Sequence, residues 1–213
     1  MDLKLQSYGE RAILIQNLDI TLQSSLVSLL QVSPPVGFVE FVLGYDNLMI
    51  VLNSAADLGA FRTWLTDLLE VGLDPPVEPR LIEVPTRYDG EDLDWVAKQS
   101  HLSVDEVIAI HSGAEYRVRM MGFAPGFPYL DGLDPCLYLD RRASPRNHIE
   151  PGSVAIGGSH AGIYSVASPG GWHLLGRTEL PMFRPDLARM NEPDPTKIFT
   201  LRIGDRVKFM NLG

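Results

Sequence analysis

The stretch GSVAIGGSHAGIYSVASPGGWHLLG, residues 152–176, decides the fold of this chain. It lies in a longer segment, 122–176, that holds ten of the chain's 19 glycines and six of its 16 prolines, so regular helix is improbable there. Glycine turns separate short β-capable pieces in and beyond this segment, at 153–156, 163–166, 173–175, 198–203 and 207–210. This pattern predicts a compact β-barrel whose loops carry function.

The first part of the chain carries a different pattern, in which strand and helix signals alternate. The expected elements are a strand at 11–16, a helix over 22–30, a hairpin over 36–52, a helix over 58–69 and a strand at 81–84. The order β-α-β-β-α-β predicts a small ferredoxin-like domain. The fold class is therefore α+β, with this small domain followed by the β-barrel domain.

A run of prolines, Asp74–Pro79, marks the predicted domain boundary, because proline opposes both helix and strand pairing. The predicted domains are residues 1–79 and 80–213. Two helices should open the second domain. The first is expected over 90–99, and Ser103 with Glu106 forms a capping box that begins the second.

Composition excludes several function classes. The formal net charge is −9 and only four residues are lysine, so a basic surface for nucleic acid or anionic lipid is not expected. No apolar run approaches the roughly 20 residues of a membrane helix, and the first residues do not resemble a signal peptide. With Cys136 as the single cysteine, we expect a cytoplasmic protein.

Nucleotide and metal motifs are also missing. No lysine follows a glycine, so there is no P-loop to bind a nucleoside triphosphate. The five histidines do not form the helical pairs that bind a metal ion. The sequence therefore predicts no metal site and no autonomous ATPase.

Three glycine-proline loops remain as candidates for the chemistry. In the first, GFAPGFPYL (122–130), the rings of Phe123, Phe127 and Tyr129 either form the walls of a binding pocket or fill the core beneath the loop. In the second, Pro145 precedes Arg146, and a restrained arginine can bind a carboxylate or phosphoryl group.

We interpret Arg146 as the anion-binding residue of a small-molecule site. Arg141 and Arg142, just before it, are interpreted as exposed or interface charges, because arginine is seldom buried.

The third loop region is 152–173, whose glycine amides can face a developing anion, while two aromatic rings shape the pocket around it. The alternative is that these glycines serve only tight turns of the barrel. The residues concerned are Gly157, Gly158, Gly170 and Gly171 for the amides, and Tyr164 and Trp172 for the rings.

These loops, taken together, resemble a known family. It contains the B subunit of 5-oxoprolinase, sporulation kinase inhibitor I and the subunit 1 domain of allophanate hydrolase. The matching motifs are YGERAILI (8–15), EDLDWVAKQSHLSVDEVIAIH (91–111), GFAPGFPYLDGL (122–133), RRASPR (141–146), GSVAIGG (152–158), GIY (162–164), SPGGWHLLGRT (168–178) and GDRVKF (204–209). The resemblance implies a cyclophilin-like β-barrel.

The resemblance also implies an activity. The B subunit works with a C subunit of related barrel fold and an A subunit to hydrolyse 5-oxoproline to L-glutamate with ATP and Mg²⁺, and we expect the chain alone to be inactive. Arg146 and Arg177 would then bind the substrate carboxylate or the transferred phosphoryl group, and no residue is assigned as catalytic acid or base. The alternatives are a non-catalytic inhibitor of a sensor histidine kinase and subunit 1 of an allophanate hydrolase.

Overall fold

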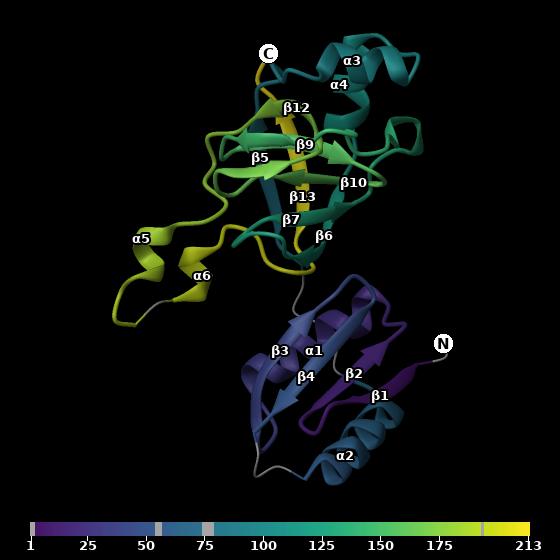
Figure 1. Ribbon diagram of the computed structural model, residues 1–213, viewed down its shortest axis with the longest axis vertical. Coiled ribbons are helices and arrows are strands. Elements are labelled where there is room, and N and C mark those ends of the chain that lie inside the picture. The colour runs from purple at the N-terminus through teal and green to yellow at the C-terminus, as the bar shows by residue number, and fades with distance from the viewer. Residues whose placement is uncertain (1–2, 54–56, 74–78, 193) are drawn as a thin grey trace. The chain divides into compact units, whose positions relative to one another are not determined.

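The computed structural model of the chain describes residues 3–53, 57–73, 79–192 and 194–213. It divides into two compact units, Met1–Pro79 and Arg80–Gly213 (Figure 1). Of the proline-rich segment Asp74–Pro79, residues 74–78 lie outside the described residues.

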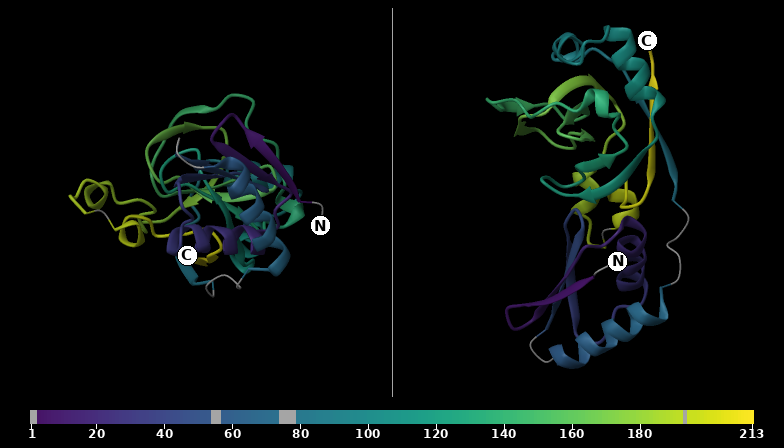
Figure 2. Two further views of the ribbon diagram at one scale, coloured as in Figure 1. Left: turned by 90° about the horizontal axis from the view of Figure 1, so that it is seen from below. Right: turned by 90° about the vertical axis from the view of Figure 1, so that its right-hand side faces the viewer.

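The first unit is a four-stranded antiparallel sheet with two helices on one face (Figures 1 and 2). The strands follow the order β1-β2-β4-β3 across the sheet. The elements are β1 (Lys4–Tyr8), β2 (Ala12–Gln16), α1 (Ile20–Val32), β3 (Phe38–Leu43), β4 (Asn47–Leu52) and α2 (Leu58–Val71). The predicted hairpin over 36–52 is confirmed as β3 and β4.

Aspartates begin both helices of this unit. The Asp19 carboxylate accepts a hydrogen bond from Leu22 N at 2.8 Å, and that of Asp57 accepts one from Gly59 N at 2.8 Å. The apolar stripes of the helices pack on the sheet. The core consists of Ile13, Ile15, Leu18, Leu26, Val27, Leu30, Leu48, Ile50, Leu52, Phe61 and Leu65.

The ferredoxin-like order is not confirmed. The strand expected at 81–84 to complete this sheet is β5 (Leu81–Thr86), and it pairs in parallel with β13 (Arg206–Asn211) of the second unit. Val84 and Thr86 of this strand are fully buried. The fourth strand of the first sheet is instead β1, which the sequence analysis missed because its residues are mostly polar and exposed.

The second unit contains a seven-stranded sheet that forms a nearly closed barrel, in the order β12-β9-β10-β7-β6-β13-β5. The remaining strands of this sheet are β6 (Tyr116–Met121), β7 (Pro128–Asp131), β9 (Ser153–Gly157), β10 (His160–Ile163) and β12 (His173–Arg177). The predicted barrel and the α+β class are confirmed.

A backbone bridge joins the two edge strands of this sheet. Arg87 N donates to Arg177 O at 2.9 Å, and Arg177 N donates to Arg87 O at 2.8 Å. The neighbouring Gly176 has no room for a side chain, since a Cβ atom there would lie 2.2 Å from Arg87 O. Glycine at this position is what allows the edges to meet.

Two helices, α3 (Leu93–Gln99) and α4 (Val104–Gly113), pack on β12 and β13 respectively (Figures 1 and 2). The predicted capping box of α4 is confirmed: Ser103 N donates to Glu106 Oε2 at 2.7 Å, and Glu106 N donates to Ser103 Oγ at 3.2 Å. In the described part of the chain, no helix has both the length and the apolar character needed to cross a membrane.

Two strand predictions were inaccurate. The piece expected at 198–203 is not a strand, because α6 (Pro195–Ile198) occupies its start and Gly204 lies in a turn before β13. This helix and α5 (Pro185–Ala188) lie on an excursion from the barrel (Figure 1). The piece expected at 163–166 contributes only Ile163, the last residue of β10.

Candidate functional site

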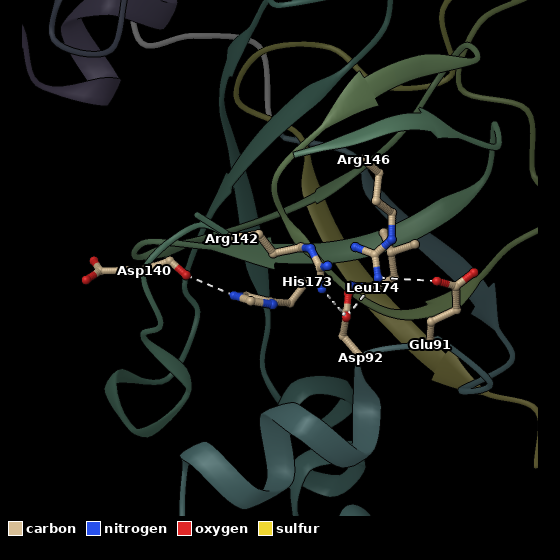
Figure 3. A network of polar contacts seen from close by, with 7 residues as sticks. All are labelled: Glu91, Asp92, Asp140, Arg142, Arg146, His173 and Leu174. Carbon is tan, nitrogen blue, oxygen red and sulfur yellow. Dashed lines mark hydrogen bonds and ion pairs between the residues drawn. The ribbon is translucent and has the colours of Figure 1, made fainter. Parts of the chain in front are cut away.

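A buried carboxylate, that of Asp92, joins three separate segments of the second unit (Figure 3). It accepts hydrogen bonds from Arg142 Nη1 at 3.0 Å, from Arg146 Nη2 at 2.8 Å and from the backbone Leu174 N at 2.8 Å. The side chain of Asp92 is only 6% exposed. We call Asp92, Arg142 and Arg146 the arginine node.

The two arginines of the node stabilise the charged form of Asp92. Burial alone would raise the pKa of Asp92, but the hydrogen bonds from Arg146 and Leu174 and the two guanidinium charges outweigh it, so the pKa lies below its ordinary value. Asp92 is therefore ionised at neutral pH, and it holds two positive side chains in fixed positions.

The strands around Arg146 set the direction of its side chain. Arg146 is the first residue of β8 (Arg146–Ile149), where it pairs with Gly170 of β11 (Ser168–Gly170). Nearby, Arg142 N donates to Gly171 O at 2.8 Å. Both arginines are thus tied through the backbone to the same glycine pair.

Both guanidinium groups keep N–H donors that Asp92 does not use. Among the described residues, Arg146 Nη1 and Arg142 Nε are buried without a hydrogen-bond partner. The Arg146 side chain is 16% exposed, and its Nη2 also lies 3.3 Å from the exposed carboxylate of Glu91. A guanidinium group held in a fixed position can bind a small carboxylate or phosphoryl group through N–H donors that remain free.

Three buried rings, those of Phe127, Tyr164 and Trp172, pack against one another, and we call them the aromatic cluster. The ring centroids of Phe127 and Tyr164 are 5.2 Å apart, those of Phe127 and Trp172 are 5.4 Å apart, and both pairs meet edge to face. Phe127 therefore fills the core, one of the two alternatives for the first loop.

The arginines lie close to the aromatic cluster. Arg141 Cζ is 5.7 Å from the centroid of the Trp172 ring, a cation–π contact. Burial raises the pKa of Tyr164, while the Trp172 backbone and the charges of Arg141 and Arg146 act in the opposite direction. Tyr164 thus stands within electrostatic reach of Arg146.

The predicted glycines serve this packing in different ways. A Cβ atom on Gly157 would lie 2.7 Å from the Trp172 ring, and one on Gly170 would lie 2.1 Å from the Tyr164 hydroxyl oxygen. These two glycines let the rings rest on the backbone. Gly158 has φ of +62°, and its N–H donates to Leu139 O at 2.8 Å, so that amide already has a partner within the protein.

Arg177 lies in a different environment from Arg146. Its guanidinium forms an ion pair with Asp89 at 2.9 Å, and its side chain is 66% exposed. The arginine that shares a carboxylate with Arg146 is Arg142, which the sequence analysis interpreted as an exposed or interface charge. The Arg142 side chain is 36% exposed, and the structure adds a partner that this interpretation did not include, because its Nη1 binds the buried Asp92 50 residues away in the chain.

Sequence reasoning missed Asp92 altogether. It is one of 27 acidic residues and stands at the start of a predicted helix, where acidic residues are common for reasons of helix capping. Its three donors come from residues 50, 54 and 82 positions away. Only the folded structure brings them together.

His173 lies beside the arginine node. It is buried, and its Nε2 lies 2.8 Å from the carbonyl oxygen of Asp140 (Figure 3). Its ring stacks on Trp95 with centroids 4.3 Å apart. Because a carbonyl oxygen only accepts hydrogen bonds, we assign a proton to Nε2 in this contact. The stacking on Trp95, a residue of α3, holds the His173 ring against this helix.

The fold and the site together define a class of protein: a β-barrel domain in which a buried aspartate holds two arginines close to a cluster of aromatic rings. Comparison with known proteins identifies the family. The model of the carboxyltransferase domain, subdomain C and D, matches residues 3–192, and the chain belongs to this family.

Two bacterial proteins that carry names are similar to this chain in sequence. The B subunit of 5-oxoprolinase from Bacillus subtilis is 46% identical over 148 residues, which cover 68% of this chain and 58% of that protein. The B subunit of 5-oxoprolinase from Escherichia coli O157:H7 is 40% identical over 180 residues, which cover 81% of this chain and 77% of that protein.

A solved structure, the crystal structure of TTHA0988, is also similar, with a TM-score of 0.79 and 33% sequence identity. The match covers 96% of this chain and 40% of that one. The chain thus spans less than two thirds of the length of TTHA0988 and of the Bacillus subtilis relative.

Proposed function

We propose that this chain is the B subunit of an ATP-dependent 5-oxoprolinase, which opens 5-oxoproline to L-glutamate together with A and C subunits in the cytoplasm. The relatives named as B subunits of 5-oxoprolinase support this function. The observation that carries it is the arginine node, in which the buried Asp92 fixes the guanidinium groups of Arg142 and Arg146, whose side chains are 36% and 16% exposed.

The arginine node fits the substrate of this reaction. 5-oxoproline is a small lactam with one carboxylate, and a guanidinium pair held by a buried aspartate binds a carboxylate without having to be ordered first. Tyr164 and Trp172 would border the ring of the lactam. Because Gly158 N is bound to Leu139 O, Gly157, Gly170 and Gly171 are the remaining glycines proposed to line the substrate.

The role of this chain in catalysis would be to bind and orient. A lactam carbonyl reacts slowly with water, and ATP with Mg²⁺ in the assembled enzyme would supply a phosphoryl group that activates its oxygen. Holding the substrate carboxylate at Arg146 and Arg142 fixes the position of the carbonyl carbon relative to that chemistry. Arg177, exposed and paired with Asp89, stays a candidate for the phosphoryl group.

We assign no Mg²⁺ site to this chain. Within the described ranges, no three His, Cys, Asp or Glu side chains come together as metal ligands. Asp92 does not fit that role either, because its carboxylate oxygens are bound by two arginines and a backbone N–H.

The test is glutamate release from 5-oxoproline with ATP. Three mixtures are compared: this chain alone, its co-expressed A and C partners without it, and the complete set. Activity only in the complete set is the expected result. No activity in a set shown by gel filtration to be assembled would contradict the proposal, and would favour the kinase-inhibitor or allophanate hydrolase alternatives.

A further inference from the structure

The loop Gly122–Phe127 holds an aromatic residue in an unfavourable backbone conformation. Phe123 has φ of +66°, and Ala124 N donates to Gly122 O at 2.7 Å across it. A hydrogen bond between residues two apart around a positive φ describes the rare, strained form of the γ-turn. For a bulky side chain such a conformation is a real outlier, and outliers of this kind cluster at functional sites.

Other hydrogen bonds and close contacts of the loop hold the backbone of Phe123 in this conformation. Gly122 N donates to Phe127 O at 3.1 Å, and Phe127 N donates to Ala124 O at 3.0 Å. Gly126 has φ of +79°, and a Cβ atom there would lie 3.0 Å from Phe183 Cβ. Phe127 itself is buried in the aromatic cluster. The strain at Phe123 is therefore maintained by the anchored ends of the loop.

The ring of Phe123 does not fill the core. It is 60% exposed, although it meets Phe127 edge to face with centroids 5.4 Å apart and Tyr164 at 6.4 Å. A glycine at this position would avoid the strain, and burial of the ring does not explain its presence. The exposed face of the ring is therefore the feature that can explain why phenylalanine stands at this position.

A continuous set of contacts leads from Phe123 to the arginine node. Phe123 contacts the Tyr164 ring, the hydroxyl of Tyr164 lies against Gly170, and Gly170 pairs with Arg146 in the β8–β11 ladder. An anion bound at Arg146 would thus have polar contacts on one side and apolar rings on the other. The ligand that fits is a carboxylate with a small hydrocarbon ring.

We propose that Phe123 is a specificity-determining residue, whose exposed ring covers the methylene side of a small cyclic carboxylate bound at Arg146. The inference rests on the proposed function, in which this ligand is 5-oxoproline. Binding of the carboxylate alone does not require Phe123, so the inference gives this strained loop residue a separate role.

The test compares Phe123→Gly, Phe123→Leu and a control, Tyr138→Ala, which removes another exposed ring of the same unit. In the assembled enzyme, Phe123→Gly should raise the KM for 5-oxoproline about tenfold, as expected for uncovering roughly two methylene groups, and change kcat little. Phe123→Leu should restore most of the affinity. Tyr138→Ala should leave KM unchanged.

Thermal unfolding separates this role from a structural one. Because glycine relieves the positive φ, Phe123→Gly should keep the melting temperature within about 2 °C of the wild type. An unchanged KM in Phe123→Gly would overturn the proposal while leaving the proposed function intact. Failure of Phe123→Gly to assemble with its partners would also overturn it, by making the ring a contact between subunits. Absence of glutamate release by the wild-type assembly would refute the proposed function and this inference together.

Discussion

The two units of the chain bury different kinds of side chain. Among the described residues of the first unit, the buried polar ones are the neutral Gln23, Ser24 and Ser25, and the Gln23 amide nitrogen donates to the backbone oxygens of Gly44 and Asn47. The second unit buries charged or ionisable groups, among them Asp92, His111, Arg119 and His173.

Burying an ionisable group carries a free-energy penalty unless it is paired or neutral, so such groups persist where they have a use. We interpret the first unit as held together by its apolar core, whereas the proposed functional site lies in the second unit. The following predictions test that contrast in order of decreasing effect.

Leu65→Ala should give the largest loss of stability, confined to the first unit. Leu65 is fully buried in the core of that unit, and the substitution should lower its free energy of unfolding by about 3 kcal/mol. Hydrogen exchange followed by mass spectrometry would show faster exchange in peptides from 3–53 and little change in those from 80–192. The exposed Val71→Ala is the control. Equal acceleration in both units would contradict the contrast.

Asp92→Asn should destabilise the second unit by about 2 kcal/mol, because two charge-assisted hydrogen bonds lose their charged acceptor. Urea unfolding at neutral pH measures this change. Asp94→Asn removes an exposed carboxylate two residues away and should change stability by less than about 0.5 kcal/mol. Similar effects of the two variants would mean that the arginine node does not stabilise the barrel.

His111 should make the stability of the second unit depend on pH. Burial lowers the pKa of His111 to about 3, and its Nδ1 lies 2.8 Å from the Tyr88 hydroxyl. The folded-state pKa lies below the unfolded value near 6.5, so the unfolded chain binds the proton first as pH falls. Stability is complete above about pH 6.5 and should fall by about 1 kcal/mol between pH 7 and pH 5.5.

Denaturant unfolding at several pH values would test this. His111→Gln should abolish the pH dependence between pH 7 and about pH 5.5, a range above the titration of ordinary carboxylates. The exposed His148→Gln is the control and should leave the dependence in place. A wild-type stability that stays constant over this range would refute the prediction.

The sequence was sufficient where the signals are local. The capping box at Ser103, the hairpin over 36–52 and the glycine-rich barrel segment each depend on residues close together in the chain, and each is confirmed. The resemblance identified the family, because its motifs are short and contiguous.

Contacts between distant segments could not be predicted in the same way. Leu81–Thr86 has a strand pattern, but which sheet it joins depends on β13, more than 100 residues later. Arg142 and Arg177 are equally polar in sequence, and only the position of the buried Asp92 distinguishes them. The strain at Phe123 arises from hydrogen bonds of the folded loop, since nothing in the residue type requires a positive φ.

The central claim is that the arginine node of the second unit binds the substrate carboxylate. The most direct test is calorimetric titration of the assembled enzyme with 5-oxoproline, comparing Arg146→Lys with Arg177→Lys. Lysine keeps the charge but loses the planar, multi-donor geometry, so Arg146→Lys should weaken binding about tenfold or more. Arg177→Lys should change the Kd by less than about twofold, because that guanidinium is exposed and paired with Asp89. Equal effects of the two variants, or unchanged binding in Arg146→Lys, would contradict the account.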